Sequence, residues 1–229
     1  MGGSAEKMKV LIHACPRRMW YVTEFLVPNL IEQGADAVEV WNDEDGKGNL
    51  ASCMECFASV KGDGVTWHIQ DDVLPRRDFV ERCRELEPDR SVYGFCNEQF
   101  TDDPDQTGRV YQLDSWHSFQ CVLIPDAYAR ECAEWFYSGE WKNTQRQDIE
   151  VLYNTNRGDD TFFQEFLMQR HGGDMVTNAK PNLVEHVDWI VGGSVLFTWS
   201  GYLSRAYYWD DEDLVKDLKQ KVKGKVRYE

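Results

Sequence analysis

Short apolar runs alternate with longer segments of helical spacing along the first third of the chain. Three apolar runs predict strands, at residues 9–15, 37–42 and 65–70. The first of them is apolar almost throughout, which is typical of a strand buried on both faces of a sheet. Segments 19–33 and 49–60 have apolar residues at helical spacing, and a glycine follows each of them. This order predicts an α/β fold that begins with a parallel sheet flanked by helices.

The rest of the chain continues the pattern with less regularity. Strand-like segments are expected at 91–97 and 110–124, and helices at 79–86, 126–135 and 161–170. Residues 181–187 form a short apolar segment with one histidine. Residues 210–229 are highly charged with apolar residues at helical spacing, which predicts an amphipathic terminal helix or a frayed tail. We therefore expect a single catalytic domain over 9–209, preceded by a polar extension at 1–8 that is disordered or not native.

Net charge, apolar run lengths and cysteine content bear on which ligands and which cellular compartment we expect for this chain. The 229 residues carry a formal net charge of −15, which disfavours binding driven by attraction to nucleic-acid phosphates. No apolar run is long enough for a spanning helix, and no secretory signal is visible. Seven cysteines cannot all pair within the chain, so we expect reduced thiols and a cytoplasmic location. Cys53 and Cys56 have the Cys-x-x-Cys spacing of one half of a zinc site, but their apolar surroundings favour thiols that are buried in the core.

Two adjacent carboxylates at the end of the third predicted strand are the main candidate for chemistry. Asp71 and Asp72 would repel each other at a buried strand end, and Mg²⁺ or Mn²⁺ would remove that cost. Parallel strands end at the same edge of a sheet, so Arg17-Arg18 and Asn42-Asp43 should lie near the pair. The alternative is a solvated turn in which an aspartate caps the next helix.

Several motifs in order resemble the GT-A fold glycosyltransferases, the nucleotide-diphospho-sugar transferases, and especially their small bacterial and phage members. The motifs are a Pro-Arg strand end, a strand ending in Asp, Gln70-Asp71-Asp72 in place of the DxD motif, Asp159-Asp160 opening a helix, and Pro181-Asn182-Leu183-Val184-Glu185-His186. The resemblance covers about residues 9–200. It implies a central, mostly parallel mixed sheet flanked by helices, and a bacterial or phage-infected host cell. It also implies a metal-dependent enzyme that moves a sugar from a nucleotide-diphospho-sugar, with a UDP-sugar favoured, to a hydroxyl acceptor.

The resemblance also implies residue roles. Asp72 and His186 would hold Mn²⁺ or Mg²⁺, and Asp43 and Arg17 would contact the nucleotide. The family has an acidic residue where this chain has Gln70, so either Gln70 or Asp71 would contact the donor's ribose or sugar. Asp160 or Asp159 would be the general base, because an acceptor hydroxyl must lose its proton.

Each role has a structural alternative. The pair Asp159-Asp160 is also an ordinary helix start, His186 a core histidine, and Arg17 and Arg18 solvated charges. Aromatic residues that could line an acceptor site or form a lid are more often core; they are Trp116, His117, Trp199, Tyr202, Tyr207, Tyr208 and Trp209.

Two other functions remain open at this point. A nucleotidyltransferase that makes sugar nucleotides would share the fold, but such proteins have a glycine-rich loop and a lysine after the first strand. Residues 14–18 here read Ala-Cys-Pro-Arg-Arg. A non-catalytic carbohydrate-binding protein of the same fold would bind sugar without nucleotide hydrolysis. The acceptor is either a bacterial glycan or a hydroxylated base in phage DNA, and the net charge disfavours DNA.

Overall fold

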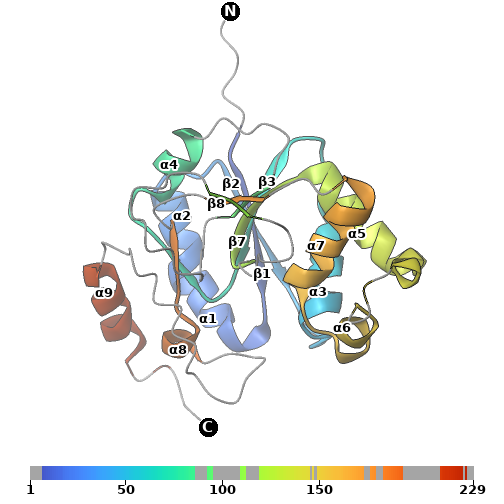
Figure 1. The fold of residues 1–229 in the computed structure, drawn as a ribbon. Helices are drawn as coiled ribbons and strands as arrows, with labels where there is room; N and C mark the ends of the chain where they lie inside the picture. The colour runs from blue at the N-terminus through green and yellow to red at the C-terminus, as the bar shows by residue number, and fades with distance from the viewer. Residues whose placement is uncertain are drawn as a thin grey trace, which may run out of the picture.

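A seven-stranded mixed sheet forms the centre of the molecule (Figure 1). This computed structural model describes residues 7–85, 92–94, 109–111, 119–144, 146, 149–172, 176–178, 183–192, 212–223 and 225. Within them the strands are β1 (Lys9–Ala14), β2 (Ala37–Asn42), β3 (Val65–Gln70), β5 (Tyr93–Gly94), β6 (Arg109–Tyr111), β7 (Cys121–Pro125) and β8 (Val176–Asn178). Their order in the sheet is β2-β1-β3-β7-β5-β8-β6.

Strand directions agree with the predicted class. Strand β1 pairs in parallel with β2 and β3, and β5 pairs in parallel with β8. Strand β7 is antiparallel to both β3 and β5, and β6 is antiparallel to β8. In the part of the central sheet that the structure describes, β1, β2, β3, β5 and β8 therefore run in one direction, and β6 and β7 run in the other. The predicted α/β fold with a mostly parallel mixed sheet flanked by helices is confirmed.

A second, two-stranded sheet lies beside the end of β3. It consists of β4 (Val73–Pro75) and β9 (Val184–His186), which pair antiparallel with Val73 opposite His186. The backbone N–H of Val187 also donates to the carbonyl oxygen of Asp72, at 2.7 Å. A segment more than a hundred positions away in sequence is thereby held against the paired aspartates.

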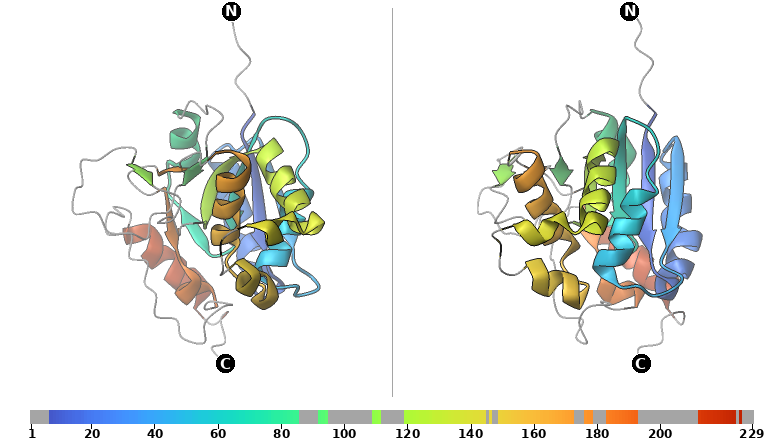
Figure 2. Two further views of the ribbon diagram at one scale, coloured as in Figure 1. Left: turned by 45° about the vertical axis from the view of Figure 1, so that its right-hand side comes forward. Right: turned by 90° about the vertical axis from the view of Figure 1, so that its right-hand side faces the viewer.

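Helices cover both faces of the central sheet, as the two turned views show (Figure 2). On one side lie α3 (Asn49–Ala58), α5 (Asp126–Ser138) and α7 (Asp159–Arg170), with η4 (Glu140–Asn143) and α6 (Ile149–Thr155) beyond them. On the other lie α1 (Met19–Tyr21), η2 (Val22–Leu26), α2 (Val27–Glu32), α4 (Phe79–Glu85), α8 (Asp188–Val191) and α9 (Glu212–Val222). The turn η1 (Pro16–Arg18) leads from β1 into the second group.

The side chains of β1 divide between two hydrophobic clusters. Val10 and Ile12 are fully buried in the cluster that includes α2, α4 and α9, while Leu11 points into the cluster of α3, α5 and α7. A strand with helices on both faces needs apolar residues at every position, which explains the unbroken apolar run. Cys53 and Cys56 are buried in the second cluster, where the core-thiol reading places them.

The predicted helix over 19–33 forms with one irregular turn. Residues 22–26 are a π-helical turn in which the N–H of Val27 donates to the carbonyl oxygen of Val22. Pro28 follows at once. A proline cannot donate to the carbonyl four residues earlier and its ring crowds that carbonyl, so the wider turn accommodates it.

The charged C-terminal segment contains a packed helix. Leu214, Leu218 and Val222 of α9 are buried in the first cluster, at the helical spacing read from the sequence. None of the described helices is both long and apolar enough to cross a membrane.

Candidate active site at the carboxyl ends of β1, β2 and β3

The pairing register brings three strand ends to one edge of the sheet. His13 lies opposite Gln70 across the β1–β3 pair, and Ala14 lies opposite Asn42 across the β1–β2 pair. The residues that follow each strand therefore start from neighbouring positions. The side chains predicted from Arg17-Arg18, Asn42-Asp43 and Asp71-Asp72 all emerge at this edge.

Arg18, rather than Arg17, reaches the paired aspartates. The Arg18 side chain is 2% exposed. Its Nη1 lies 2.9 Å from Asp71 Oδ1 and also donates to Asp72 Oδ2. Arg17 is exposed on the same turn. One buried arginine thus pairs with both aspartates, as expected from its place after the first strand, and the alternative of a solvated charge does not hold for Arg18.

The two aspartates differ in their proton affinity. Burial alone would raise the pKa of Asp72, but Arg18 and His186 hold that pKa well below its usual range. The pKa of Asp71 is raised, first by burial and then by the negative charge of Asp72, although Arg18 and the backbone N–H of Cys15 favour the charged form. Asp72 is therefore firmly ionised at neutral pH.

His186 lies next to Asp72, as the predicted metal pair requires. Its Nε2 is 3.4 Å from Asp72 Oδ2, and its side chain is largely buried. The β4–β9 pairing sets this position, because Val73 immediately follows Asp72 in the chain.

A divalent ion fits the donors at this pair. Asp72 Oδ1 is buried and has no hydrogen-bond partner among the described residues, although the carboxylate is ionised. An oxygen in that state costs free energy unless a cation or another donor reaches it. Among the described residues no group of three or more ligating side chains assembles. Of the residues that the structure describes, Asp72 and His186 would thus hold the ion, and Mg²⁺ or Mn²⁺ commonly completes such a shell with water and phosphate.

Gln70 connects the strand end to the start of α7. Gln70 Nε2 donates to Asp159 Oδ2 at 3.1 Å, and the N–H of Asp159 donates to Asn49 Oδ1 at 3.3 Å. Burial, followed by the charge of Asp160, raises the pKa of Asp159 to about 7. Asp159, bound to Gln70, and Asp72 are thus both connected to the end of β3, and their pKa values are displaced in opposite directions. Such a pair is a frequent property of catalytic sites.

Asp160 and Asp43 have local structural partners. Asp160 is half-buried, and its Oδ1 accepts the N–H of Thr161 at 2.6 Å. The Asp43 carboxylate accepts the backbone N–H groups of Lys47 at 2.9 Å and of Gly48 at 3.2 Å. Asp43 thus shapes the turn between β2 and α3. Its predicted contact with the nucleotide stays a prediction, as does a catalytic role for Asp160.

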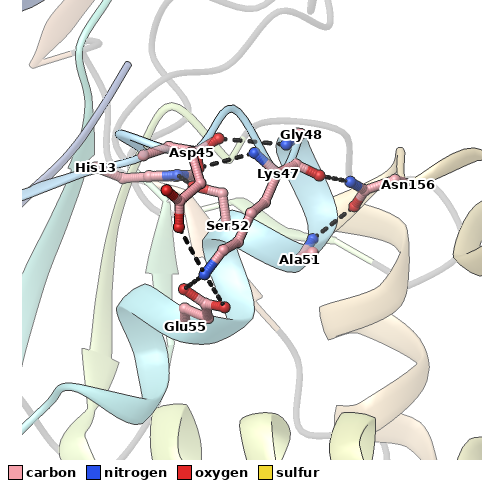
Figure 3. A network of polar contacts seen from close by, with 9 residues as sticks. His13, Asp45, Lys47, Gly48, Ala51, Ser52, Glu55 and Asn156 are labelled. Atoms are coloured by element: carbon pink, nitrogen blue, oxygen red, sulfur yellow. Dashed lines mark hydrogen bonds and ion pairs between the residues drawn. The ribbon is translucent and has the colours of Figure 1, made fainter. Parts of the chain in front are cut away.

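The turn after β2 belongs to a polar network on the α3 side of the sheet (Figure 3). His13 Nε2 and Ser52 Oγ share a hydrogen bond of 2.6 Å, and Lys47 Nζ donates to the Glu55 carboxylate at 2.7 and 2.8 Å. Burial lowers the pKa of His13 to about 4, so its ring is neutral at pH 7. A neutral imidazole at this edge adds a hydrogen-bonding group without adding positive charge.

Asn156 connects this turn to the start of α7. Its Oδ1 accepts the N–H of Ala51 at 2.6 Å, and its Nδ2 donates to the carbonyl oxygen of Lys47. Its φ is +52°, in the left-handed region that asparagine tolerates better than most residues. Gly48 makes room for it, since a Cβ there would lie 2.4 Å from Asn156 Nδ2. The sequence offered only a weak signal for this contact, an Asn in a loop before Arg-Gly.

Two substitutions of Asn156 separate the contribution of its side-chain hydrogen bonds from that of its left-handed backbone conformation. Asn156→Gly removes the side-chain hydrogen bonds but tolerates the left-handed backbone, and should lower the free energy of unfolding by about 1–2 kcal/mol. Asn156→Ala adds about 1 kcal/mol of backbone strain to that loss. Urea unfolding of both variants measures the difference. Equal stabilities would show that the backbone conformation at 156 is not strained by a side chain.

Some predicted residues lie outside the described part of the chain. These are Trp116, His117, Trp199, Tyr202, Tyr207, Tyr208 and Trp209. Among the described residues, sequence reasoning missed Asn49, Ser52, His13 and Asn156. Each of them acts through a contact between segments far apart in the chain.

No protein-family model matches the chain, and no curated protein matches its sequence. Two solved structures are similar in fold. The inositol-1-phosphate CTP transferase from T. maritima aligns over 99% of this chain and 100% of its own, with a TM-score of 0.46 and 10% identity. A protein assigned as a glucose-1-phosphate thymidylyltransferase from Bacillus anthracis, in complex with a sucrose, aligns over 75% and 85%, with a TM-score of 0.39 and 10% identity. Similarity at this level assigns no family to this chain.

Proposed function

We propose that this protein is a metal-assisted transferase that acts on a nucleotide sugar. The proposal rests on two pairs of side chains at one edge of the sheet. Ionised Asp72 lies beside His186, and Asp159, whose pKa is raised, accepts a hydrogen bond from Gln70. The first pair suits a cation that neutralises a diphosphate. The second suits proton transfer near neutral pH.

The residues have distinct tasks in this proposal. Asp72 and His186 would hold Mg²⁺ or Mn²⁺, which would stabilise negative charge on a diphosphate leaving group. Arg17 is exposed on the turn after β1, where it could contact the nucleotide or its phosphates, and Asp43 and Asp71 line the same edge. We assign the donor's sugar or ribose to Gln70 and Asp71, as the resemblance implies.

Glycosyl transfer to a hydroxyl is the first of two finer possibilities. A hydroxyl nucleophile must lose a proton, and Asp159 is a carboxylate that changes charge near pH 7. Asp160 is the alternative base. The acceptor would be a glycan hydroxyl in preference to DNA, because the chain's net charge of −15 opposes a polyanion.

Nucleotidyl transfer is the second possibility. The similar solved structures are both described as nucleotidyltransferases, and neither as a glycosyltransferase. The segment after β1 has no glycine-rich loop, and in that reaction the nucleophile is a phosphate that needs no general base. On these two chemical points we propose glycosyl transfer first, and nucleotidyl transfer as the alternative that the similar solved structures favour.

Thermal stabilisation by ligands tests the proposal. Purified protein is heated with UDP, UDP-sugars, CDP-sugars, CTP and dTTP, each with and without Mn²⁺, since a ligand that binds only the folded state raises the Tm. We expect a Tm increase with at least one nucleotide that requires the metal and is lost in Asp72→Asn. Incubation with that nucleotide then separates the reactions: release of nucleoside diphosphate indicates glycosyl transfer, and release of pyrophosphate from a triphosphate and a sugar phosphate indicates nucleotidyl transfer. No increase with any nucleotide would contradict the proposal and favour a non-catalytic carbohydrate-binding protein.

A further inference from the structure

Arg18 is an unusual residue at this edge because it is both buried and shared. Arginine is rarely fully buried unless its charge is paired. One guanidinium here serves two carboxylates, through Asp71 Oδ1 and Asp72 Oδ2. The three groups together carry one uncompensated negative charge when both aspartates are ionised.

Hydrogen bonding at this triad is incomplete. Arg18 Nε and Asp72 Oδ1 are both buried, and neither has a hydrogen-bond partner within the described residues. Asp71 is better satisfied, because its Oδ2 accepts the N–H of Cys15 at 2.7 Å. The unsatisfied donor and the unsatisfied acceptor mark the two places where another group would stabilise the site: a cation at Asp72 and an anion at Arg18.

We infer that Arg18 is a built-in counter-ion that competes with the divalent ion for Asp72, and that a diphosphate relieves this competition by binding the guanidinium. This inference rests on the proposed metal pair, Asp72 and His186. A cation that approaches Asp72 meets the positive charge of Arg18 at close range, which weakens its binding. Phosphate oxygens offer the guanidinium a new partner. Metal and nucleoside diphosphate therefore bind cooperatively through Arg18, in addition to any direct contact between them.

This arrangement has a consequence for the protein without ligands. A site that bound metal only through bare carboxylates would need the ion for its stability. With Arg18 in place, both carboxylates have an ion-pair partner and one of their two charges is compensated in the absence of metal. We expect chelators to leave the Tm of the wild-type protein unchanged.

Manganese binding without nucleotide tests the inference directly. Free Mn²⁺ is followed by electron paramagnetic resonance during titration into the full chain at pH 7.5. Arg18→Met should bind Mn²⁺ at least about tenfold more tightly than wild type, because it removes the competing charge. The matched control is Arg84→Met, which removes the same charge from a surface pair with Asp36. The control should bind as wild type does, within about twofold, because surface charges are screened.

Addition of UDP measures the coupling. In wild type, UDP should increase Mn²⁺ affinity by a larger factor than in Arg18→Met, since only the wild type has an arginine to move from carboxylate to phosphate. Arg18→Lys should lie between them, because an ammonium keeps the charge but cannot bridge two groups in a fixed plane.

A second variant and the Mn²⁺ binding of wild type distinguish failure of the inference from failure of the proposed metal pair. If Arg18→Met does not fold, Arg18→Met/Asp71→Asn removes one charge of each sign and preserves Asp72 and His186. It should bind Mn²⁺ more tightly than wild type, because Asp72 no longer has a competing partner, but by a smaller factor than Arg18→Met, because the attraction of the Asp71 charge is lost as well. Affinity equal to or weaker than wild type, in whichever variant folds by circular dichroism, would overturn the inference alone, provided that wild type binds Mn²⁺ with UDP and Asp72→Asn does not. Absence of Mn²⁺ binding in every chain, with or without UDP, would overturn the proposed metal pair and the inference together.

Discussion

Asp159→Asn is expected to yield a protein that is more stable than wild type and almost inactive. The activity loss follows from the proposed role as general base, which contributes about 10²- to 10⁴-fold to a rate. The gain in stability follows from burial, because Asp159 is 6% exposed and its pKa is raised to about 7. An amide fills the same volume without a charge to desolvate.

The raised pKa of Asp159 determines how the stability difference between Asp159→Asn and wild type changes with pH. In the unfolded chain an aspartate loses its proton near pH 4, by typical values, whereas Asp159 in the folded protein keeps its proton to about pH 7. Between those values the folded state binds more protons, so the contribution of Asp159 to stability falls as pH rises through this window. Asp159→Asn should match wild type below pH 4 and exceed it most above pH 7. Urea unfolding at several pH values measures the difference.

Asp160→Asn is the matched comparison for activity. Its side chain is half-buried, and an asparagine oxygen can still accept the N–H of Thr161. If Asp159 is the base, the rate of nucleoside diphosphate release in wild type should rise with pH through about 7. Removing the neighbouring charge at 160 should move that midpoint to lower pH. A larger rate loss for Asp160→Asn than for Asp159→Asn would instead assign the base to Asp160. Equal activity of both variants and wild type would contradict a base at this helix start.

Asp72→Asn is expected to have the second large effect, on both catalysis and stability. It removes the ionised oxygen proposed to hold the metal, so nucleotide-dependent turnover in Mn²⁺ should fall by about 10³-fold. It also leaves buried Arg18 with Asp71 as its remaining carboxylate among the described residues. Breaking one side of a buried ion pair typically lowers the free energy of unfolding by about 3 kcal/mol.

Asp71→Asn and a double variant complete this experiment. Asp71 has a raised pKa and is not a proposed metal ligand, so its replacement should reduce turnover by far less, about tenfold. Arg18→Met/Asp72→Asn removes both charges of the closest pair and should cost less stability than the sum of the single variants. Additive losses would show that Arg18 and Asp72 are not coupled. Turnover by Asp72→Asn at the wild-type rate would contradict the metal assignment.

The sequence by itself determined most of the first half of the fold. The predicted segments coincide with β1, β2, β3 and α3 to within two residues, because the relevant signals are local: apolar runs, helical spacing and a glycine after each helix. The C-terminal segment, predicted as a helix or a frayed tail, contains α9. Local signals also placed Asp72 at a strand end and Asp159 at a helix start. The π-helical turn before Pro28 is local in cause as well, although the pattern alone predicted a regular helix.

Only the tertiary structure decided which charges meet. Gln70 hydrogen-bonds Asp159, a contact that the sequence did not indicate. Arg18, for which a solvated charge was the structural alternative, lies buried between two aspartates. The order in which β7 and β5 join the sheet, and the pairing of β4 with β9 that brings His186 to Asp72, depend on contacts across long stretches of chain. Charge pairing and pKa displacement depend on distance and burial, and neither quantity can be read from spacing along a sequence.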